Sequence, residues 1–363
     1  MRLLPLAAAG IAAVLGLYLG LWPVPIAPMP WVAPPNPGLT GPFSANTRLA
    51  PAEVLTLPGE RGPEDIALDA SGRLYASAEG GHIVRFERDG THPAIWATTG
   101  GRPLGIDFDR EGNLLVADAV RGLLSIAPDA RVSVLATEAS GASIRYANDV
   151  DVAADGRVFF SDATGRFAPA EHGGTMAASV VDLLEHGSTG RLLVWDPTTR
   201  VATTALAGLS FANGVAVSPD QRFVLVNETG EYRVRRLWLS GPDAGKDDVL
   251  VGDLPGFPDN ISAGEGRFWV GLVSPRDPAL DGMAAWPALR RIAQRLPPAL
   301  RPAAKAYGHV IAVSPSGAVV QDLQDPAAKI PLTTGAIETP DALYVTSLTA
   351  SGVGRLSKAS AGL

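Results

Sequence analysis

The stretch Ile66-Ala-Leu-Asp-Ala-Ser-Gly-Arg-Leu-Tyr-Ala-Ser77 decides the fold, because the chain repeats its pattern. An alternating segment is followed by an Asp/Gly turn and a second apolar segment, which is typical of a β-hairpin. The pattern returns at Ile106–Ala117, Val150–Ser161, Val215–Val226, Ile261–Val270 and, in a degenerate form, Ile337–Thr346. Where nothing is inserted, the turns lie about 40 to 45 residues apart, the length of a four-stranded propeller blade. The sequence therefore predicts an all-β fold, a six-bladed β-propeller over residues 51–363.

Composition fits one closed domain and excludes several classes of function. The chain has 363 residues, 30 Lys and Arg against 37 Asp and Glu, and a net charge of −7, so no nucleic-acid partner is expected. It has no cysteine, which excludes disulfides, thiolate catalysis and Cys-based metal sites. A single blade cannot bury its own faces, so the repeats must close into one domain.

The N-terminal region predicts a transmembrane helix over residues 1–22, followed by a linker over residues 23–50. Residues 3–22 carry no charge, and 20 helical residues span about 30 Å, the thickness of the hydrocarbon core of a bilayer. The flanking Arg2 favours a cytoplasmic N-terminus and places the propeller on the extracytoplasmic side. A cleaved signal peptide is the alternative. Eight of the twenty residues from Pro23 to Pro42 are proline, which favours a semi-rigid spacer.

A cap insertion is expected at about residues 274–306, where the repeats are interrupted. Apolar residues recur there at helical spacing, at Leu289, Ile292, Leu296 and Leu300. Arginines accompany them, so the segment is either a helix that caps the propeller or a basic amphipathic helix that touches a bilayer. Pro297 and Pro298 interrupt the helical pattern, which favours the capping helix.

Oxygen-bearing side chains stand just before the first strand of four repeats, at Glu64, Asn148, Asn213 and Asp259, with Asn260 adjacent. Equivalent positions on different blades converge on the axis of a ring, so these oxygens are expected to meet there. Carboxylate and amide oxygens without His or Cys form a hard ligand set that suits Ca²⁺. Taken singly, each residue has an alternative role in a turn-forming hydrogen bond. Their recurrence on four blades favours a calcium site.

Six longer stretches carry a family resemblance: Tyr146–Val150, Gly190–Leu193, Phe211–Val215, Glu228–Arg236, Leu254–Ile261 and Phe268–Leu272. Through them the chain resembles the strictosidine synthase-like group of six-bladed propellers, which includes membrane-anchored adipocyte plasma membrane-associated proteins. The wider superfamily contains gluconolactonases and paraoxonases, which hold calcium in the central tunnel. The resemblance maps the ligands of that ion onto the four side chains named above. It also places Asp65 and Asp149 where paraoxonases bind a second, structural calcium.

The expected activity is calcium-dependent hydrolysis of small esters or lactones, because a tunnel Ca²⁺ can act as a Lewis acid on a carbonyl. The histidine pair of paraoxonases is replaced by Leu104 and Asp118. The resemblance to strictosidine synthases instead points to Glu338 as the catalytic carboxylate and to His309 as a pocket residue. Two alternatives remain open: a non-catalytic scaffold stabilised by calcium, and a condensing enzyme of the strictosidine synthase type. The expected partners are a small ester or lactone substrate and, through the N-terminal helix, a membrane.

Overall fold

Each repeated hairpin forms the two inner strands of a four-stranded antiparallel sheet. The computed structural model describes residues 3–363, with side chains from residue 10 onward, and this part of the chain holds six such sheets. Blade one is β2 (Ile66–Leu68), β3 (Leu74–Ser77), β4 (His82–Phe86) and β5 (Ala94–Thr98), and blade two is β6 (Pro103–Phe108), β7 (Leu114–Asp118), β8 (Gly122–Ile126) and β9 (Val132–Ala136). Blade three is β12 (Ala147–Val152), β13 (Val158–Asp162), β14 (Gly190–Asp196) and β15 (Val201–Leu209). Blade four is β16 (Ala212–Val217), β17 (Phe223–Glu228), β18 (Arg233–Trp238) and β19 (Asp247–Val251), and blade five is β20 (Gly256–Gly264), β21 (Arg267–Pro275), β22 (Gly308–Val313) and β23 (Val319–Asp325).

Blade six joins the two ends of the propeller and closes the ring. Its strands are β24 (Thr333–Glu338), β25 (Ala342–Ser347), β26 (Gly352–Ser357) and, from the other end of the chain, β1 (Glu53–Thr56). β1 pairs antiparallel with β26, with Glu53 opposite Arg355. The six-bladed propeller predicted from the repeats is confirmed.

The Asp/Gly turns work through side-chain hydrogen bonds to the backbone. Asp69 Oδ1 accepts hydrogen bonds from the backbone N–H groups of Ser71 at 2.9 Å and Arg73 at 3.0 Å. Gly72 has a φ of +80°, a conformation that glycine adopts without steric cost. The turn residues seen in the sequence therefore fix the spacing of the two inner strands.

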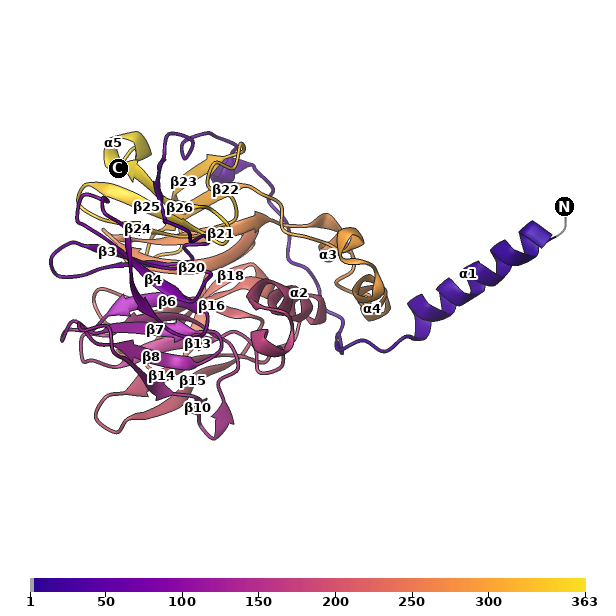
Figure 1. Cartoon of the computed structure of the whole chain (residues 1–363), viewed down its shortest axis with the longest axis horizontal. Coiled ribbons are helices and arrows are strands. Elements are labelled where there is room, and N and C mark those ends of the chain that lie inside the picture. The colour runs from indigo at the N-terminus through magenta and orange to yellow at the C-terminus, as the bar shows by residue number, and fades with distance from the viewer. Residues whose placement is uncertain (1–2) are drawn as a thin grey trace.

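The helices over the propeller come from the two long gaps between repeats. α2 (Thr175–Glu185) lies between β13 and β14, and α3 (Pro278–Gly282), α4 (Pro287–Arg295) and the short η4 turn (Pro298–Leu300) lie between β21 and β22. Arg290 of α4 donates to the carbonyl oxygens of Leu184 and Glu185 at the end of α2, so the insertion packs against α2 (Figure 1). The remaining short elements are β10 (Glu138–Ala139), β11 (Ala142–Ser143), η1 (Gly41–Phe43), η2 (Pro169–Glu171), η3 (Thr229–Glu231) and α5 (Lys358–Ala361).

The proline-rich segment lies against the propeller. The Trp31 ring stacks on the His186 ring, with centroids 3.7 Å apart and planes 7° apart. Arg276 donates to the carbonyl oxygens of Pro34 at 2.7 Å and Pro35 at 3.0 Å. Ile26 and Phe43 are buried in the apolar core. These contacts hold the linker against the folded domain.

The predicted transmembrane helix over residues 1–22 is not supported. The backbone forms α1 (Leu3–Leu21), and residues 1–2 lie outside the described residues. Across the part of the chain for which side chains are described, we find no helix with both the length and the apolar character needed to cross a bilayer. Arg295 of α4 donates to the carbonyl oxygens of Leu19 and Trp22 at 2.6 Å each, which fixes the end of α1 against the cap.

Candidate functional site

One position of the inner strand recurs around the ring, two residues before the apolar residue at which continuous pairing with the second strand begins. Those apolar residues are Ile66, Ile106, Val150, Val215, Ile261 and Ala336. The residues at the recurring position are, in blade order, Glu64, Leu104, Asn148, Asn213, Asp259 and Thr334. In blades two to six the strand register shifts beside this position, and such a bulge turns a side chain out of the regular alternation. The four side chains predicted as ligands are therefore structurally equivalent.

These four side chains line one cavity of about 200 Å³. Arg102, Tyr146 and the rim residues Arg61 and Glu79 line the same cavity. The structure thus brings together residues from blades one, three, four and five. Sequence reasoning missed Arg102 and Tyr146, although Tyr146 lies within a stretch that carries the family resemblance.

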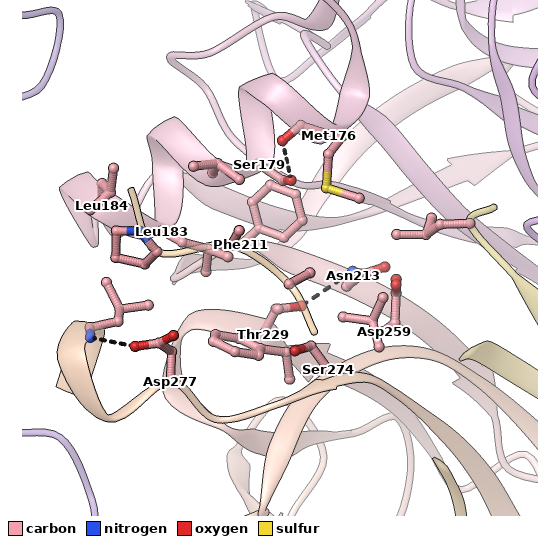
Figure 2. A pocket seen from close by; sticks show the side chains of 18 residues that line it. Met176, Ser179, Leu183, Leu184, Phe211, Asn213, Thr229, Asp259, Ser274 and Asp277 are labelled. Carbon is pink, nitrogen blue, oxygen red and sulfur yellow. Dashed lines mark hydrogen bonds between the residues drawn. The ribbon is translucent and has the colours of Figure 1, made fainter. Parts of the chain in front are cut away.

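A second, mainly apolar cavity of about 100 Å³ adjoins the first (Figure 2). Leu183 of α2, Phe257 of β20 and Leu280 of α3 contribute to its walls. The two cavities share six residues: Met176, Ser179, Phe211, Asn213, Asp259 and Leu348. The sequence did not predict α2, even though Ala178, Val181 and Leu184 recur there at helical spacing and are buried.

Oxygen atoms of three of the four side chains are buried without a hydrogen-bond partner in the described structure: Glu64 Oε2, Asn148 Oδ1 and Asn213 Oδ1. The orientation of Asn213 follows from its neighbour, because Thr229 Oγ1 donates to the Pro258 carbonyl at 2.7 Å. Thr229 Oγ1 then accepts from Asn213 Nδ2 at 3.2 Å, which leaves the amide oxygen free. Buried oxygens without donors are costly unless a cation or water satisfies them. This donor set fits a hard cation.

Burial and mutual repulsion disfavour the charged carboxylates of this site. Burial raises the pKa of Glu64 well above its usual range, and the negative charges of Asp259 and Asp65 raise it further. Burial raises the pKa of Asp259 to about 7. A divalent cation among these oxygens would favour the charged forms instead. Over the described residues no group of three or more His, Cys, Asp or Glu side chains could hold a metal, so a cation here would depend on the amide oxygens as well.

Asp65 and Asp149, the residues expected at a second calcium, bridge neighbouring blades. Asp65 Oδ2 accepts a hydrogen bond from the N–H of Ile106 at 2.9 Å. Asp149 accepts from the N–H groups of Val150 at 2.8 Å and Val215 at 2.7 Å. The predicted neighbour Asn260 donates from Nδ2 to the Glu64 carbonyl at 3.0 Å, and its own Oδ1 is unpartnered among the described residues. Asn260 therefore supports the backbone of Glu64.

The structure does not bring Glu338 to this cavity. It is the last residue of β24, whereas Thr334, near the other end of that strand, donates to the Glu64 carbonyl at 2.6 Å. Glu338 accepts hydrogen bonds from Trp269 Nε1 at 2.8 Å and pairs with Lys358 Nζ at 2.9 Å. Burial alone would raise the pKa of Glu338, but these two donors and the charge of Arg267 lower it. The structure places Ala336, and not Ile337, at the position that Ile66 has in blade one. The sixth repeat is therefore aligned one residue earlier than its sequence indicates.

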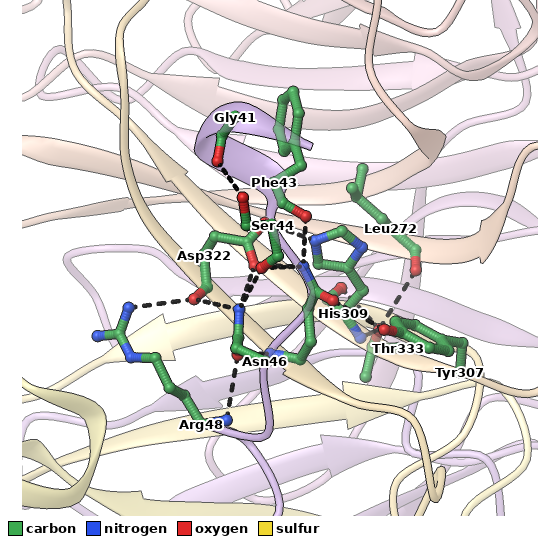
Figure 3. Close-up of polar contacts among 11 residues, drawn as sticks. Gly41, Phe43, Ser44, Asn46, Arg48, Leu272, Tyr307, His309, Asp322 and Thr333 are labelled. Atoms are coloured by element: carbon green, nitrogen blue, oxygen red, sulfur yellow. Dashed lines mark hydrogen bonds and ion pairs between the residues drawn. The ribbon is translucent and has the colours of Figure 1, made fainter. Parts of the chain in front are cut away.

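His309 also lies outside both cavities. Its Nε2 contacts Asp322 Oδ2 at 2.8 Å, and Asp322 Oδ1 accepts from Asn46 Nδ2 at 2.8 Å and Gln324 Nε2 at 2.6 Å (Figure 3). Gln324 also donates to the Phe43 carbonyl at 3.0 Å. This buried network attaches residues 43–46 of the linker to blade five.

Comparisons with known proteins agree with this architecture. Residues 148–242 match the family model "Strictosidine synthase", and residues 41–86 match "Strictosidine synthase-like, N-terminal". The chain is 40% identical to Protein STRICTOSIDINE SYNTHASE-LIKE 13 of Arabidopsis thaliana over 63% of its own length, but spans only 57% of that relative. It is 32% identical to the adipocyte plasma membrane-associated protein of Rattus norvegicus, covering 84% of this chain and 85% of the relative.

Solved propellers share the fold at low sequence identity. A gluconolactonase from Xanthomonas campestris superposes with a TM-score of 0.62 at 17% identity, covering 92% of this chain and 98% of the other. The calcium-binding protein regucalcin from Agrobacterium tumefaciens has a TM-score of 0.56 at 15% identity, with coverages of 82% and 92%. From the extent and identity of its match to the curated relatives, the chain belongs to the strictosidine synthase-like family.

Proposed function

We propose that this protein is a calcium-dependent hydrolase of small esters or lactones. The observation that carries the proposal is the set of unpartnered buried oxygens of Glu64, Asn148 and Asn213 around one cavity. Together with Asp259, these residues would hold the ion, and both carboxylates would balance its charge. The names of two fold neighbours, a gluconolactonase and a calcium-binding protein, support the same chemistry.

The side chains that line the two cavities would bind the substrate and orient it between them. When bound, calcium would polarise the ester or lactone carbonyl and stabilise the charge that develops on its oxygen. The apolar walls formed by Leu183, Phe211 and Phe257 would hold the hydrocarbon part and exclude bulk water. Burial and the charges of Asp259 and Glu64 raise the pKa of Tyr146 well above its usual range, so its hydroxyl keeps its proton and can donate a hydrogen bond. Water would add to the carbonyl and the C–O bond to the alcohol would break, giving an acid and an alcohol, or a hydroxy acid from a lactone.

The test is hydrolysis of phenyl acetate and γ-butyrolactone by the full chain, with added calcium and with chelator. We expect turnover with calcium and loss of turnover in chelator. Equal rates under both conditions would refute the proposal. If calcium raises the thermal stability and neither substrate is hydrolysed, the scaffold alternative is favoured instead.

We further propose that α1 attaches the protein to a membrane and that the propeller lies on the extracytoplasmic side. Support comes from the name of the plasma membrane-associated relatives and from the exposed apolar side chains of α1, including Val14, Leu17 and Leu21. The test is alkaline extraction of membranes from cells that express the full chain or the double variant Val14→Arg and Leu17→Arg. The native chain should stay with the membrane and the variant should be released. Equal partitioning of the two would contradict the attachment.

A further inference from the structure

Arg102 stands out among the residues of the polar cavity because it has no acidic partner. Within the described residues no carboxylate lies within ion-pairing distance of its guanidinium group, and its Nη1 donates only to the Pro103 carbonyl, at 3.0 Å. Its Nε is buried and has no hydrogen-bond partner. A guanidinium group that is largely removed from water usually pairs with an anion. Arg102 therefore has donors available to something that enters the cavity.

Two other arginines illustrate the contacts that an arginine with a structural role makes in this protein. Arg61, at the rim of the same cavity, pairs with Glu79 at 2.6 Å. The fully buried Arg290 donates to several backbone carbonyls, including that of Glu185 at 3.0 Å. Arg102 has neither arrangement: the charges of Glu64, Glu79 and Asp118 act on it from a distance, and none of these carboxylates occupies its guanidinium donors.

The backbone beneath Arg102 is held in place. Its N–H donates to Asp118 Oδ1 at 3.1 Å, and its carbonyl accepts from the N–H of Ala119 at 2.9 Å. Asp118 Oδ1 also accepts from the N–H of Val120 at 3.0 Å. In blade two the recurring position is Leu104, which offers no oxygen, so the positive charge of Arg102 occupies this sector of the ring. The planar guanidinium fork suits a carboxylate, which it can bind through two parallel hydrogen bonds.

We propose that Arg102 binds a carboxylate group of the substrate and makes the protein selective for anionic, carboxylate-bearing esters or lactones. The selectivity rests on the hydrolase function proposed above, whereas the binding of a carboxylate does not. The carboxylate lies against Arg102 in the polar cavity, and the hydrocarbon part of the substrate enters the apolar cavity. The reacting carbonyl then lies between them, beside Asn213 and Asp259, which both cavities share. No acidic side chain has to give up a partner when such a substrate binds.

Binding is tested first, with a pair of non-reacting probes that differ in charge. Calorimetry of the full calcium-loaded chain should show that benzoate binds more tightly than benzamide. Arg102→Gln should weaken benzoate binding about 10-fold to 100-fold and leave benzamide binding within about twofold, because only the anion gains from a charged donor. Arg102→Lys, which keeps the charge and loses the fork, should fall between the two. The matched control is Arg131→Gln, which changes an exposed arginine whose carboxylate partner is 3.9 Å away and should change neither affinity.

Hydrolysis is tested second, with monobenzyl succinate, whose ester carbonyl lies between its carboxylate and its aromatic ring, and with phenyl acetate. Arg102→Gln should raise KM for monobenzyl succinate about tenfold or more and leave its kcat little changed, and the kinetics of phenyl acetate, which has no carboxylate, should change far less. Absence of benzoate binding to the native chain, or equal losses for both probes in Arg102→Gln, would overturn the proposal. If benzoate binding depends on Arg102 and neither ester is hydrolysed, the carboxylate site stands and the hydrolase function fails. If Arg102→Gln does not fold, Arg102→Lys decides by the same criteria.

Discussion

The carboxylate of Asp149 in blade three accepts a hydrogen bond from the backbone N–H of Val215 in blade four at 2.7 Å. Asp107 and Asp151 make the same kind of bridge, to the N–H groups of Val152 at 3.1 Å and Val217 at 2.6 Å. The inner strands have no further strand on their axial side, so these N–H groups would otherwise lack a partner. The ring is therefore held together by carboxylates that cross between blades as well as by the pairing of β1 with β26.

Asp149→Ala should lower the free energy of unfolding by about 1 to 3 kcal/mol, because the buried N–H of Val215 loses its acceptor. Urea denaturation in the presence of chelator measures this loss without a contribution from calcium. Asp155→Ala, in the exposed turn of the same blade, is the control and should cost less. Equal losses in the two variants would contradict the bridging role.

Gly105 should not tolerate a side chain, because a Cβ there would lie 2.0 Å from Asp149 Oδ1. Gly105→Ala therefore forces the inner strands of blades two and three apart. We expect a marked fall in the midpoint of thermal unfolding. Gly112→Ala provides a comparison at an open turn position, where the cost comes from the backbone conformation alone. A larger loss in the turn variant would argue against close packing of the inner strands.

Glu64→Gln should weaken calcium binding about tenfold or more, which corresponds to about 1.4 kcal/mol or more. The substitution keeps the shape of the side chain and removes one of the two charges that would balance the ion. Calorimetric titration of calcium into the native and variant chains measures the difference. Glu111→Gln, on an exposed turn far along blade two, should leave the affinity unchanged. Unaltered affinity in Glu64→Gln would remove Glu64 from the ligand set.

Asp182 should make the stability of the protein fall as the pH rises. Burial in α2 raises its pKa from 3.8 to about 7, so the folded protein holds this proton over a range in which the unfolded chain has released it. Stability is then fully present below about pH 4 and is lost as the pH rises through about 7, by up to about 4 kcal/mol. Asp182→Asn should flatten this profile and be the more stable protein at pH 8, as measured by thermal unfolding at pH 5 and pH 8. A parallel decline in the variant would show that other groups control the profile.

Glu338→Gln should reduce stability and leave the rate of hydrolysis unchanged. The carboxylate is engaged by Trp269 and Lys358 at the far end of β24, so its loss weakens contacts there and not at the cavity. The measurement is kcat and KM for phenyl acetate at a temperature well below the unfolding transition, beside a thermal melt. A fall in kcat of tenfold or more with an unchanged melt would restore Glu338 as the catalytic residue.

Much of the candidate site could be read from the repeats. Glu64, Asn148, Asn213 and Asp259 stand in register because each lies two residues before the apolar residue that begins its repeat, Ile66, Val150, Val215 or Ile261. Arg102 could not be found in this way. The sequence shows an arginine before a strand, but not whether a carboxylate pairs with it in the folded protein. Glu338 was proposed from the family resemblance, whereas the register of the sixth repeat puts the equivalent position at Thr334, four residues earlier in β24.

The sequence by itself determined the number of blades and the hairpin turns, because both depend on short-range patterns of apolar, Asp and Gly residues. It also determined which side chains occupy equivalent positions around the ring. Only the tertiary structure decided which polar atoms lack partners, and that α2 lines both cavities. Those features depend on contacts between residues that are distant along the chain, and no local pattern encodes them.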